Sequence, residues 1–165
     1  MTIPDPLLLE EQAGALLKER GLKLATAESC TGGLLASRIT DVPGSSAYFL
    51  GGFVSYAYEA KVSQLHVLQS TLDAHGAVSK ETVLEMARGA LQELRADMAI
   101  SISGIAGPEG GTAEKPVGTV WFALITPERE RTYLRKFEGG RLEIKALASG
   151  FALELVVSYL EGGRQ

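Results

Sequence analysis

Hydrophobic and polar residues change their spacing along this chain, and the changes predict helices that alternate with strands. Apolar residues three or four positions apart predict helices over 6–18, 34–39, 59–66, 79–94 and 141–160. Short apolar runs predict strands over 22–27, 48–56, 97–103, 117–126 and 131–138. This order predicts an α/β fold with a mixed, mostly parallel sheet and helices on both faces. No repeat or linker is visible, so we expect residues 1–165 to form a single domain.

Glycine, proline and serine mark where these elements begin and end. Gly21 is expected to cap the end of the first helix, and Ser79 to cap the start of the helix that runs to Leu94. A turn is predicted at Pro43–Ser46, and residues 162–165 are expected to fray.

Composition and charge exclude several classes of protein. The 165 residues, 45% of them hydrophobic, can bury about two-thirds of the surface of the unfolded chain. A net charge of −4 without a basic stripe argues against nucleic acid as a partner. The only cysteine, Cys30, excludes an internal disulfide, and His66 and His75 are too scattered for a metal centre. Neither a signal peptide nor an apolar stretch of membrane-spanning length is visible, so we expect a cytoplasmic protein without membrane contacts.

The segment Thr26–Gly33, with the sequence TAESCTGG, carries the strongest chemical signal. It brings hydroxyl and thiol groups to a strand-to-helix turn, where free N–H groups favour an anion or an oxyanion. The turn could supply a nucleophile, a phosphate cradle or both. Ser29 is the candidate nucleophile, but its hydroxyl could instead cap the next helix by accepting the N–H of Gly32.

Lys61 is the candidate base that would activate Ser29. It follows the second predicted strand, and the carboxyl ends of parallel strands meet at one edge of a sheet. A lysine removed from water there would have a lowered pKa and could accept a proton, whereas a solvated helix lysine could not. Cys30 could compete as a nucleophile at the helix N-terminus, or it could simply pack in the core.

A glycine-rich loop over 103–119 is the second signal. Its backbone N–H groups could face a phosphate or a ribose, with Lys115 nearby, although an ordinary long loop would have the same composition. Arg141 and Lys145 lie one turn apart at the start of the last helix. They could reach a phosphate, or they could form a solvated face with nearby glutamates.

Several segments in this order resemble one known family. They are TAESCTGG at 26–33, PGSS at 43–46, EAK at 59–61, HGAVS at 75–79, SGIAGP at 103–108 and KPVGT at 115–119. Together they resemble the CinA C-terminal domain, whose stand-alone members are nicotinamide-nucleotide amidases. The resemblance extends from Leu7 to Leu160, and 165 residues leave no room for the N-terminal domain of larger members.

The resemblance implies a three-layer α/β/α sandwich that hydrolyses the carboxamide of nicotinamide mononucleotide without a metal or an organic cofactor. It implies Ser29 as the nucleophile, Lys61 as the base and Tyr56 as a residue that aligns them. Backbone N–H groups of the turn would hold the oxyanion. The other implied substrate contacts come from the turn, the loop and the last helix: Cys30, Thr31, Gly32, Gly33, Gly104, Ile105, Ala106, Lys115, Arg141 and Lys145. The resemblance also implies a homo-oligomer.

Two positions depart from the pattern of this family. Tyr58 stands where asparagine is common, and Lys145 where arginine is common. Lysine keeps the charge but loses the fork that grips a phosphate, so we expect an effect on nucleotide affinity more than on the reaction. Two alternatives stay open: a non-catalytic nucleotide-binding module linked to competence or DNA damage, and hydrolysis of free nicotinamide.

Overall fold

Strands of both orientations form a single sheet at the centre of the molecule. The computed structural model describes residues 7–162 and contains a 5-stranded sheet of order β2-β1-β3-β4-β5. The strands are β1 Leu24–Glu28, β2 Phe49–Val54, β3 Met98–Gly104, β4 Thr119–Ile125 and β5 Glu130–Lys136. β1 pairs in parallel with β2 and with β3, whereas β4 pairs antiparallel with β3 and with β5. The carboxyl ends of β2, β1 and β3 therefore lie side by side at one edge.

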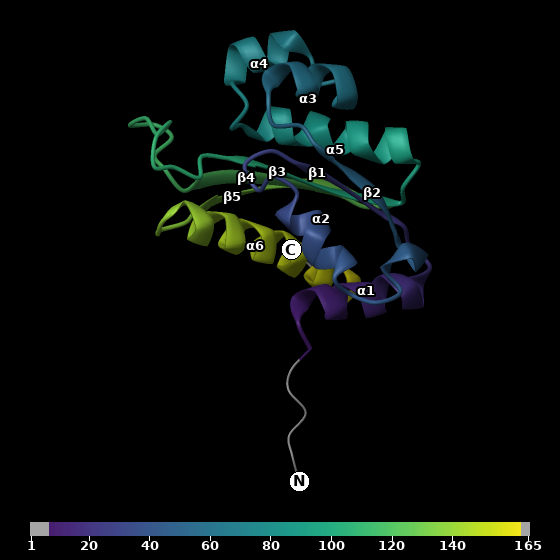
Figure 1. The fold of residues 1–165 in the computed structure, drawn as a ribbon. Helices are drawn as coiled ribbons and strands as arrows, with labels where there is room; N and C mark the ends of the chain where they lie inside the picture. Colours follow the sequence, from purple (N-terminus) through teal and green to yellow (C-terminus); the bar gives the residue numbers. More distant parts are fainter. Residues whose placement is uncertain (1–6, 163–165) are drawn as a thin grey trace.

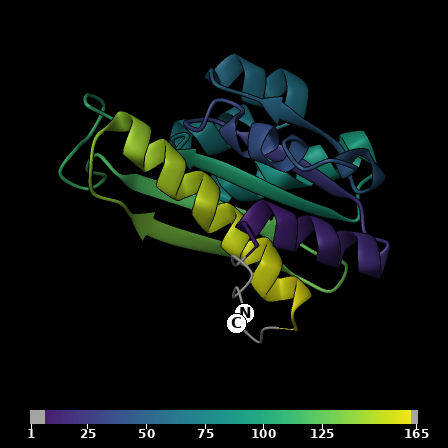
Figure 2. The ribbon, with the colours of Figure 1, turned by 60° about the horizontal axis from the view of Figure 1, so that its bottom comes forward.

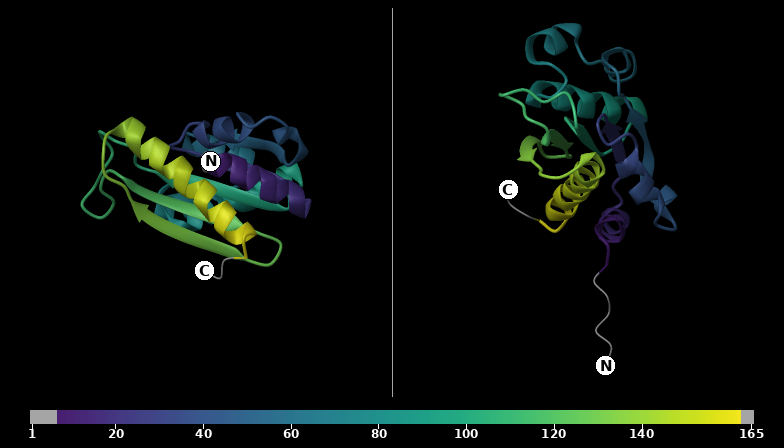
Figure 3. Two further views of the ribbon diagram at one scale, coloured as in Figure 1. Left: turned by 90° about the horizontal axis from the view of Figure 1, so that it is seen from below. Right: turned by 60° about the vertical axis from the view of Figure 1, so that its left-hand side comes forward.

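Helices cover both faces of this sheet. One face carries α3 Tyr58–Leu65, α4 Gln69–His75 and α5 Lys80–Leu94, and the other carries α1 Leu9–Arg20, α2 Leu34–Thr40 and α6 Arg141–Leu160. Figure 1 shows the layers edge-on, and the right-hand view of Figure 3 shows the same separation from the side. Figure 2 shows α6 running beside α1 across its face. Among residues 7–162, no helix is long and apolar enough to cross a membrane.

The alternation of side chains along β3 divides the core into its two halves. Ile100 and Ile102 pack in the cluster beneath α1, α2 and α6, and Ala99 packs in the cluster beneath α5. Ser101 points to the α5 side, where its hydroxyl donates to the carbonyl of Val83. The alternation therefore gives the face of the sheet to which each side chain of β3 points, up to the end of the strand.

Gly89 brings α3 close to α5. A Cβ atom at this position would collide with the backbone carbonyl of Leu65 at the end of α3. Only glycine allows this approach, because any other side chain would push the two helices apart. The packing holds α3, which carries Lys61, against the rest of the molecule.

The predicted fold is confirmed, with shifts at the ends of its elements. The last helix has the predicted bounds, Gly21 caps α1 in the left-handed conformation, and the Ser79 hydroxyl accepts the N–H of Thr82. The first helix begins at Leu9; Pro6, where it was expected to begin, lies outside the described residues, as do 163–165. The sequence did not predict α4, because this helix of 7 residues carries only one buried apolar side chain, Leu72.

Candidate active site

Serines form a row across the carboxyl ends of the parallel strands. Glu28 is in register with Val54 of β2 and with Ile102 of β3, so Ser29 is flanked by Ser55 and Ser103. The ladder continues past the strand end, since Ser29 N–H donates to Ile102 (2.9 Å) and Ser55 N–H donates to Glu28 (2.9 Å). The sheet therefore fixes the backbone of the candidate nucleophile on both sides.

Lys61 reaches this row from α3. Its Nζ lies 3.0 Å from Ser29 Oγ, 2.7 Å from the carbonyl oxygen of Ser55 and 3.2 Å from that of Tyr56. The side chain is fully buried, so the interpretation as a solvated helix lysine is wrong. The two carbonyls fix two N–H directions of the amine, which leaves its third direction toward Ser29.

Burial shifts the pKa of Lys61 and of Cys30. Loss of water around Lys61 lowers its pKa from 10.5 to about 8, because the charged ammonium is less stable away from solvent. Burial raises the pKa of the Cys30 thiol to about 11. Near neutral pH Lys61 has an appreciable neutral fraction, and Cys30 stays a thiol. The arrangement therefore favours Ser29 over Cys30 as the nucleophile.

The side chain of Glu28, rather than that of Ser29, caps α2. Its buried carboxylate accepts the Thr31 hydroxyl (2.7 Å), Leu35 N–H (2.9 Å) and Ala36 N–H (3.0 Å). Gly32 N–H donates to the backbone oxygen of Ser29 rather than to its hydroxyl, so the alternative of Ser29 as a side-chain cap is wrong.

The N–H groups that begin α2 already have partners. Besides the two that donate to Glu28, Leu34 N–H donates to Thr31 and Ser37 N–H donates to Gly33. The helix N-terminus is therefore not the free oxyanion site that the sequence suggested. Within the turn, Gly32 N–H is also engaged, and the N–H groups of Cys30, Thr31 and Gly33 stay the predicted oxyanion donors.

A cavity of about 320 Å³ opens above Ser29 and Lys61. This volume is typical of small-molecule sites. Its lining comes from the turn, from α3 and the segment before it, from 77–78, and from the glycine-rich loop: Ser29, Cys30, Tyr56, Tyr58, Lys61, Ala77, Val78, Ser103, Gly104, Ile105, Ala106, Gly107, Glu109, Gly110 and Arg141. Arg141 borders it, with its guanidinium donating to the Gly107 carbonyl (2.7 Å) and to the Tyr56 hydroxyl (3.0 Å).

Most of the site residues expected from the sequence line this cavity, and some do not. Those that line it are Ser29, Cys30, Tyr56, Lys61, Gly104, Ile105, Ala106 and Arg141. Thr31, Gly32, Gly33, Lys115 and Lys145 are outside its lining, and their role as substrate contacts stays a prediction. Thr31 is bound to Glu28, and Gly32 and Gly33 shape the turn.

Lys115 and Lys145, which do not line the cavity, contact other parts of the molecule. Lys115 borders a separate hollow near Trp121 and donates to the His75 carbonyl (2.9 Å). A Cβ on Gly32 would lie 3.6 Å from Lys145 Nζ, so this ammonium is beside the turn. His66 and His75 are exposed and lie beside Glu93 and Glu81.

Sequence reasoning did not single out Ser103, Gly107, Glu109 or Gly110 as site residues. Ser103 could have been found from the alternation of β3, which directs it to the same face as Ser101. The other three belong to a loop whose path the sequence does not determine.

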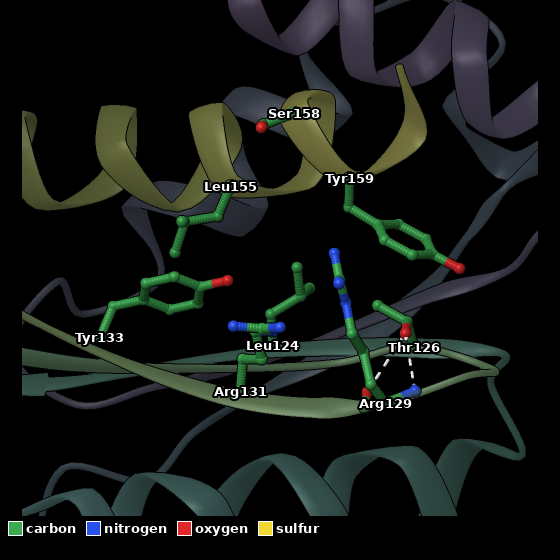
Figure 4. A pocket seen from close by; sticks show the side chains of 8 residues that line it. All are labelled: Leu124, Thr126, Arg129, Arg131, Tyr133, Leu155, Ser158 and Tyr159. Carbon is green, nitrogen blue, oxygen red and sulfur yellow. Dashed lines mark hydrogen bonds between the residues drawn. The ribbon is translucent and has the colours of Figure 1, made fainter. Parts of the chain in front are cut away.

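Another hollow lies between the β4–β5 hairpin and α6. It measures about 10 Å³ and is lined by Leu124, Thr126, Arg129, Arg131, Tyr133, Leu155, Ser158 and Tyr159, which Figure 4 shows. Arg129 stacks over the ring of Tyr159, whose hydroxyl donates to Glu128. Leu124 and Ile125 at this end of β4 pair with Ile100 and Ala99 at the amino end of β3, so the hollow is remote from Ser29 at the carboxyl ends of the parallel strands. Its volume has room for about one water molecule, and it is not the candidate site.

The described residues offer no cluster of three or more His, Cys, Asp or Glu side chains that could hold a metal ion. The charged side chains that line the cavity are Lys61, Arg141 and Glu109. Its chemistry is thus that of a hydroxyl with a buried amine beside it, bordered by a guanidinium.

Comparisons with known proteins agree with this fold. A family model described as the CinA C-terminal domain matches residues 7–160. A protein of Escherichia coli K12 named nicotinamide-nucleotide amidohydrolase PncC is 53% identical over 155 residues, covering 93% of this chain and 94% of that protein. A CinA-like protein of Chloroherpeton thalassium is 54% identical over 90% of this chain but only 36% of its own length. The crystal structure of a CinA superfamily protein from Klebsiella pneumoniae has a TM-score of 0.90 at 40% identity, covering 93% of this chain and 96% of that one.

Proposed function

This chain belongs to the CinA C-terminal domain family, and from that premise we propose that it is a nicotinamide-nucleotide amidohydrolase. It hydrolyses the carboxamide of nicotinamide mononucleotide to nicotinate mononucleotide and ammonia. The proposal includes a serine–lysine mechanism in a single amidase domain formed by residues 1–165. The contact between Lys61 Nζ and Ser29 Oγ, at 3.0 Å and away from solvent, is the observation that supports it most.

In the first step, neutral Lys61 accepts the proton of Ser29. Its two N–H groups donate to the carbonyls of Ser55 and Tyr56, so the nitrogen lone pair faces the Ser29 hydroxyl. Ser29 Oγ then attacks the carboxamide carbon, and the carbonyl π electrons move to oxygen. The result is a tetrahedral intermediate bound to Ser29, with a negative oxygen and an ammonium on Lys61.

In the second step, the Lys61 ammonium returns its proton to the substrate nitrogen. The carbon–nitrogen bond breaks, ammonia leaves, and an ester joins the nucleotide acyl group to Ser29. Lys61, again neutral, takes a proton from water that attacks this ester. Collapse of the second intermediate takes the proton from Lys61 back to Ser29 Oγ and releases the carboxylic acid, which gives its own proton to the solvent and becomes the carboxylate product.

Substrate recognition is assigned to groups around the cavity. Arg141 is the proposed partner of the phosphate, because its guanidinium has N–H groups beyond those that donate to Gly107 and Tyr56. Gly104, Ile105 and Ala106 are proposed to contact the ring and the ribose through the backbone. Tyr56 positions two groups of the site: its hydroxyl accepts a hydrogen bond from Arg141, and its carbonyl accepts one from Lys61.

The wider setting of the protein is also a proposal. We propose action in the cytoplasm, supported by the charged phosphate of the nucleotide substrate, which does not cross lipid bilayers unaided. A homo-oligomer stays a prediction, supported by exposed apolar side chains such as Leu142 and Leu147 on α6. Sedimentation or light scattering of the purified protein measures this directly.

Ammonia release tests the proposed function. The purified protein is incubated with nicotinamide mononucleotide and, separately, with nicotinamide, and ammonia is measured with a coupled dehydrogenase. We expect release from the nucleotide only, its loss in Ser29→Ala, and wild-type rates in Ser63→Ala, which changes an exposed serine of α3. If neither compound yields ammonia while the nucleotide still binds, the protein is a binding module and the proposal is wrong.

A further inference from the structure

Ser103 has a buried hydroxyl without a partner in the candidate site. Its side chain is 1% exposed, and its Oγ has no hydrogen-bond partner among the described residues. Buried hydroxyls are nearly always bonded, because an unpaired one loses its bonds to water without replacement. Since Ser103 also lines the cavity above Ser29, its free hydroxyl is available to a ligand there.

The sheet register gives the direction of this hydroxyl. Ser101, two residues earlier, points to the α5 face, so Ser103 points to that face as well. Ser29 faces the same side, because its hydroxyl contacts Lys61 of α3. Neighbouring strands are about 4.8 Å apart, so the two serines are adjacent, with room for one substrate group between their hydroxyls.

Lys61 and Ser103 flank Ser29 from opposite sides. The amine of Lys61 is held by the carbonyls of Ser55 and Tyr56, which follow β2, whereas Ser103 belongs to β3. The leaving nitrogen of the substrate must lie toward Lys61, which supplies its proton. The carboxamide oxygen can then lie on the opposite side, toward Ser103.

We propose that the Ser103 hydroxyl donates a hydrogen bond to the oxyanion that forms when Ser29 attacks the carboxamide. The donor keeps its proton throughout; it stabilises the negative oxygen while the Ser29–carbon bond forms and while the carbon–nitrogen bond breaks. This assignment rests on the proposed amidase function and deepens it. It also supplies an oxyanion donor where the N-terminus of α2 cannot, because Glu28 and the preceding turn occupy the N–H groups there.

Kinetics of Ser103→Ala test the proposal, with Ser101→Ala as the matched control. Ser101 lies on the same strand and face, is equally buried, and donates to Val83 away from the cavity. Loss of an oxyanion donor lowers kcat about 100- to 1,000-fold, and we expect this in Ser103→Ala with KM changed less than about threefold. Ser103→Thr, which keeps a hydroxyl, should recover most of the rate, and Ser101→Ala should keep the wild-type kcat.

Stability separates a catalytic role from a structural one. An unpaired buried hydroxyl stabilises nothing, so the urea midpoint of Ser103→Ala should equal or exceed that of the wild type. The Ser101→Ala midpoint should fall, because the Val83 carbonyl loses its donor. A wild-type kcat in folded Ser103→Ala, or a rise in KM alone, would overturn the assignment while leaving the amidase proposal intact. Absence of ammonia release by the wild type would instead overturn the amidase function itself.

Discussion

The pH dependence of turnover follows from the burial of Lys61. A base must be neutral to accept a proton, so raising the pH increases the active fraction until Lys61 is fully deprotonated. With the pKa of Lys61 lowered to about 8, roughly 9% of the enzyme is neutral at this residue at pH 7, and about half at pH 8. A lysine at the ordinary value of 10.5 would be neutral in only about 0.03% of molecules at pH 7. Burial therefore increases the active fraction about 300-fold at pH 7.

Ammonia release from nicotinamide mononucleotide, measured between pH 5.5 and 9.5, provides the assay. We expect kcat/KM to rise about tenfold per pH unit below pH 7 and to level off above about pH 8.5. Lys61→Met removes the base and should lower kcat about 100- to 10,000-fold. Lys61→Arg keeps a charge but cannot deprotonate, so it should be as slow. A flat wild-type profile, or the same rising limb in an active Lys61→Met variant, would refute the reasoning.

Further predictions concern residues around the cavity. Cys30→Ala should keep turnover within about fivefold of the wild type, because the Cys30 pKa of about 11 keeps the thiol protonated; a loss comparable to that of Ser29→Ala would contradict this. Arg141→Met should raise KM for the nucleotide about 10- to 100-fold with little effect on kcat, and steady-state kinetics check it. Glu28→Gln should lower the free energy of unfolding by about 2 kcal/mol in urea titration, because a charged cap of α2 is lost. Gly89→Ala should destabilise the fold by at least about 2 kcal/mol and slow turnover, since its Cβ would displace α3 at Leu65; an unchanged urea midpoint would contradict the predicted collision.

The sequence predicts the fold well because each layer has its own local signal. The apolar run of β3 and the helical spacing of α6 are unambiguous, and the end of α1 has its glycine. The short helix α4 was missed because seven residues with one buried apolar side chain carry little periodic signal. The order and type of the helices and strands could therefore be predicted from the sequence, whereas their exact ends could not.

The candidate site was predictable where it depends on the parallel strands. The rule that carboxyl ends of strands meet predicted that Lys61 would reach Ser29, and the 3.0 Å contact confirms this proximity. The role of Glu28 was not predictable from its type, because serine is also a common cap and only the turn geometry decides between them. The position of Lys115 depends on the path of a long glycine-rich loop, which no local pattern specifies.

A covalent intermediate on Ser29 tests the central claim most directly. The enzyme is mixed with excess nicotinamide mononucleotide, quenched in acid within milliseconds, digested and examined by mass spectrometry. The account predicts that the peptide containing Ser29 gains the mass of the substrate minus ammonia, and that Ser29→Ala shows neither this adduct nor ammonia release. An adduct on Cys30 instead, or full turnover by Ser29→Ala, would contradict it.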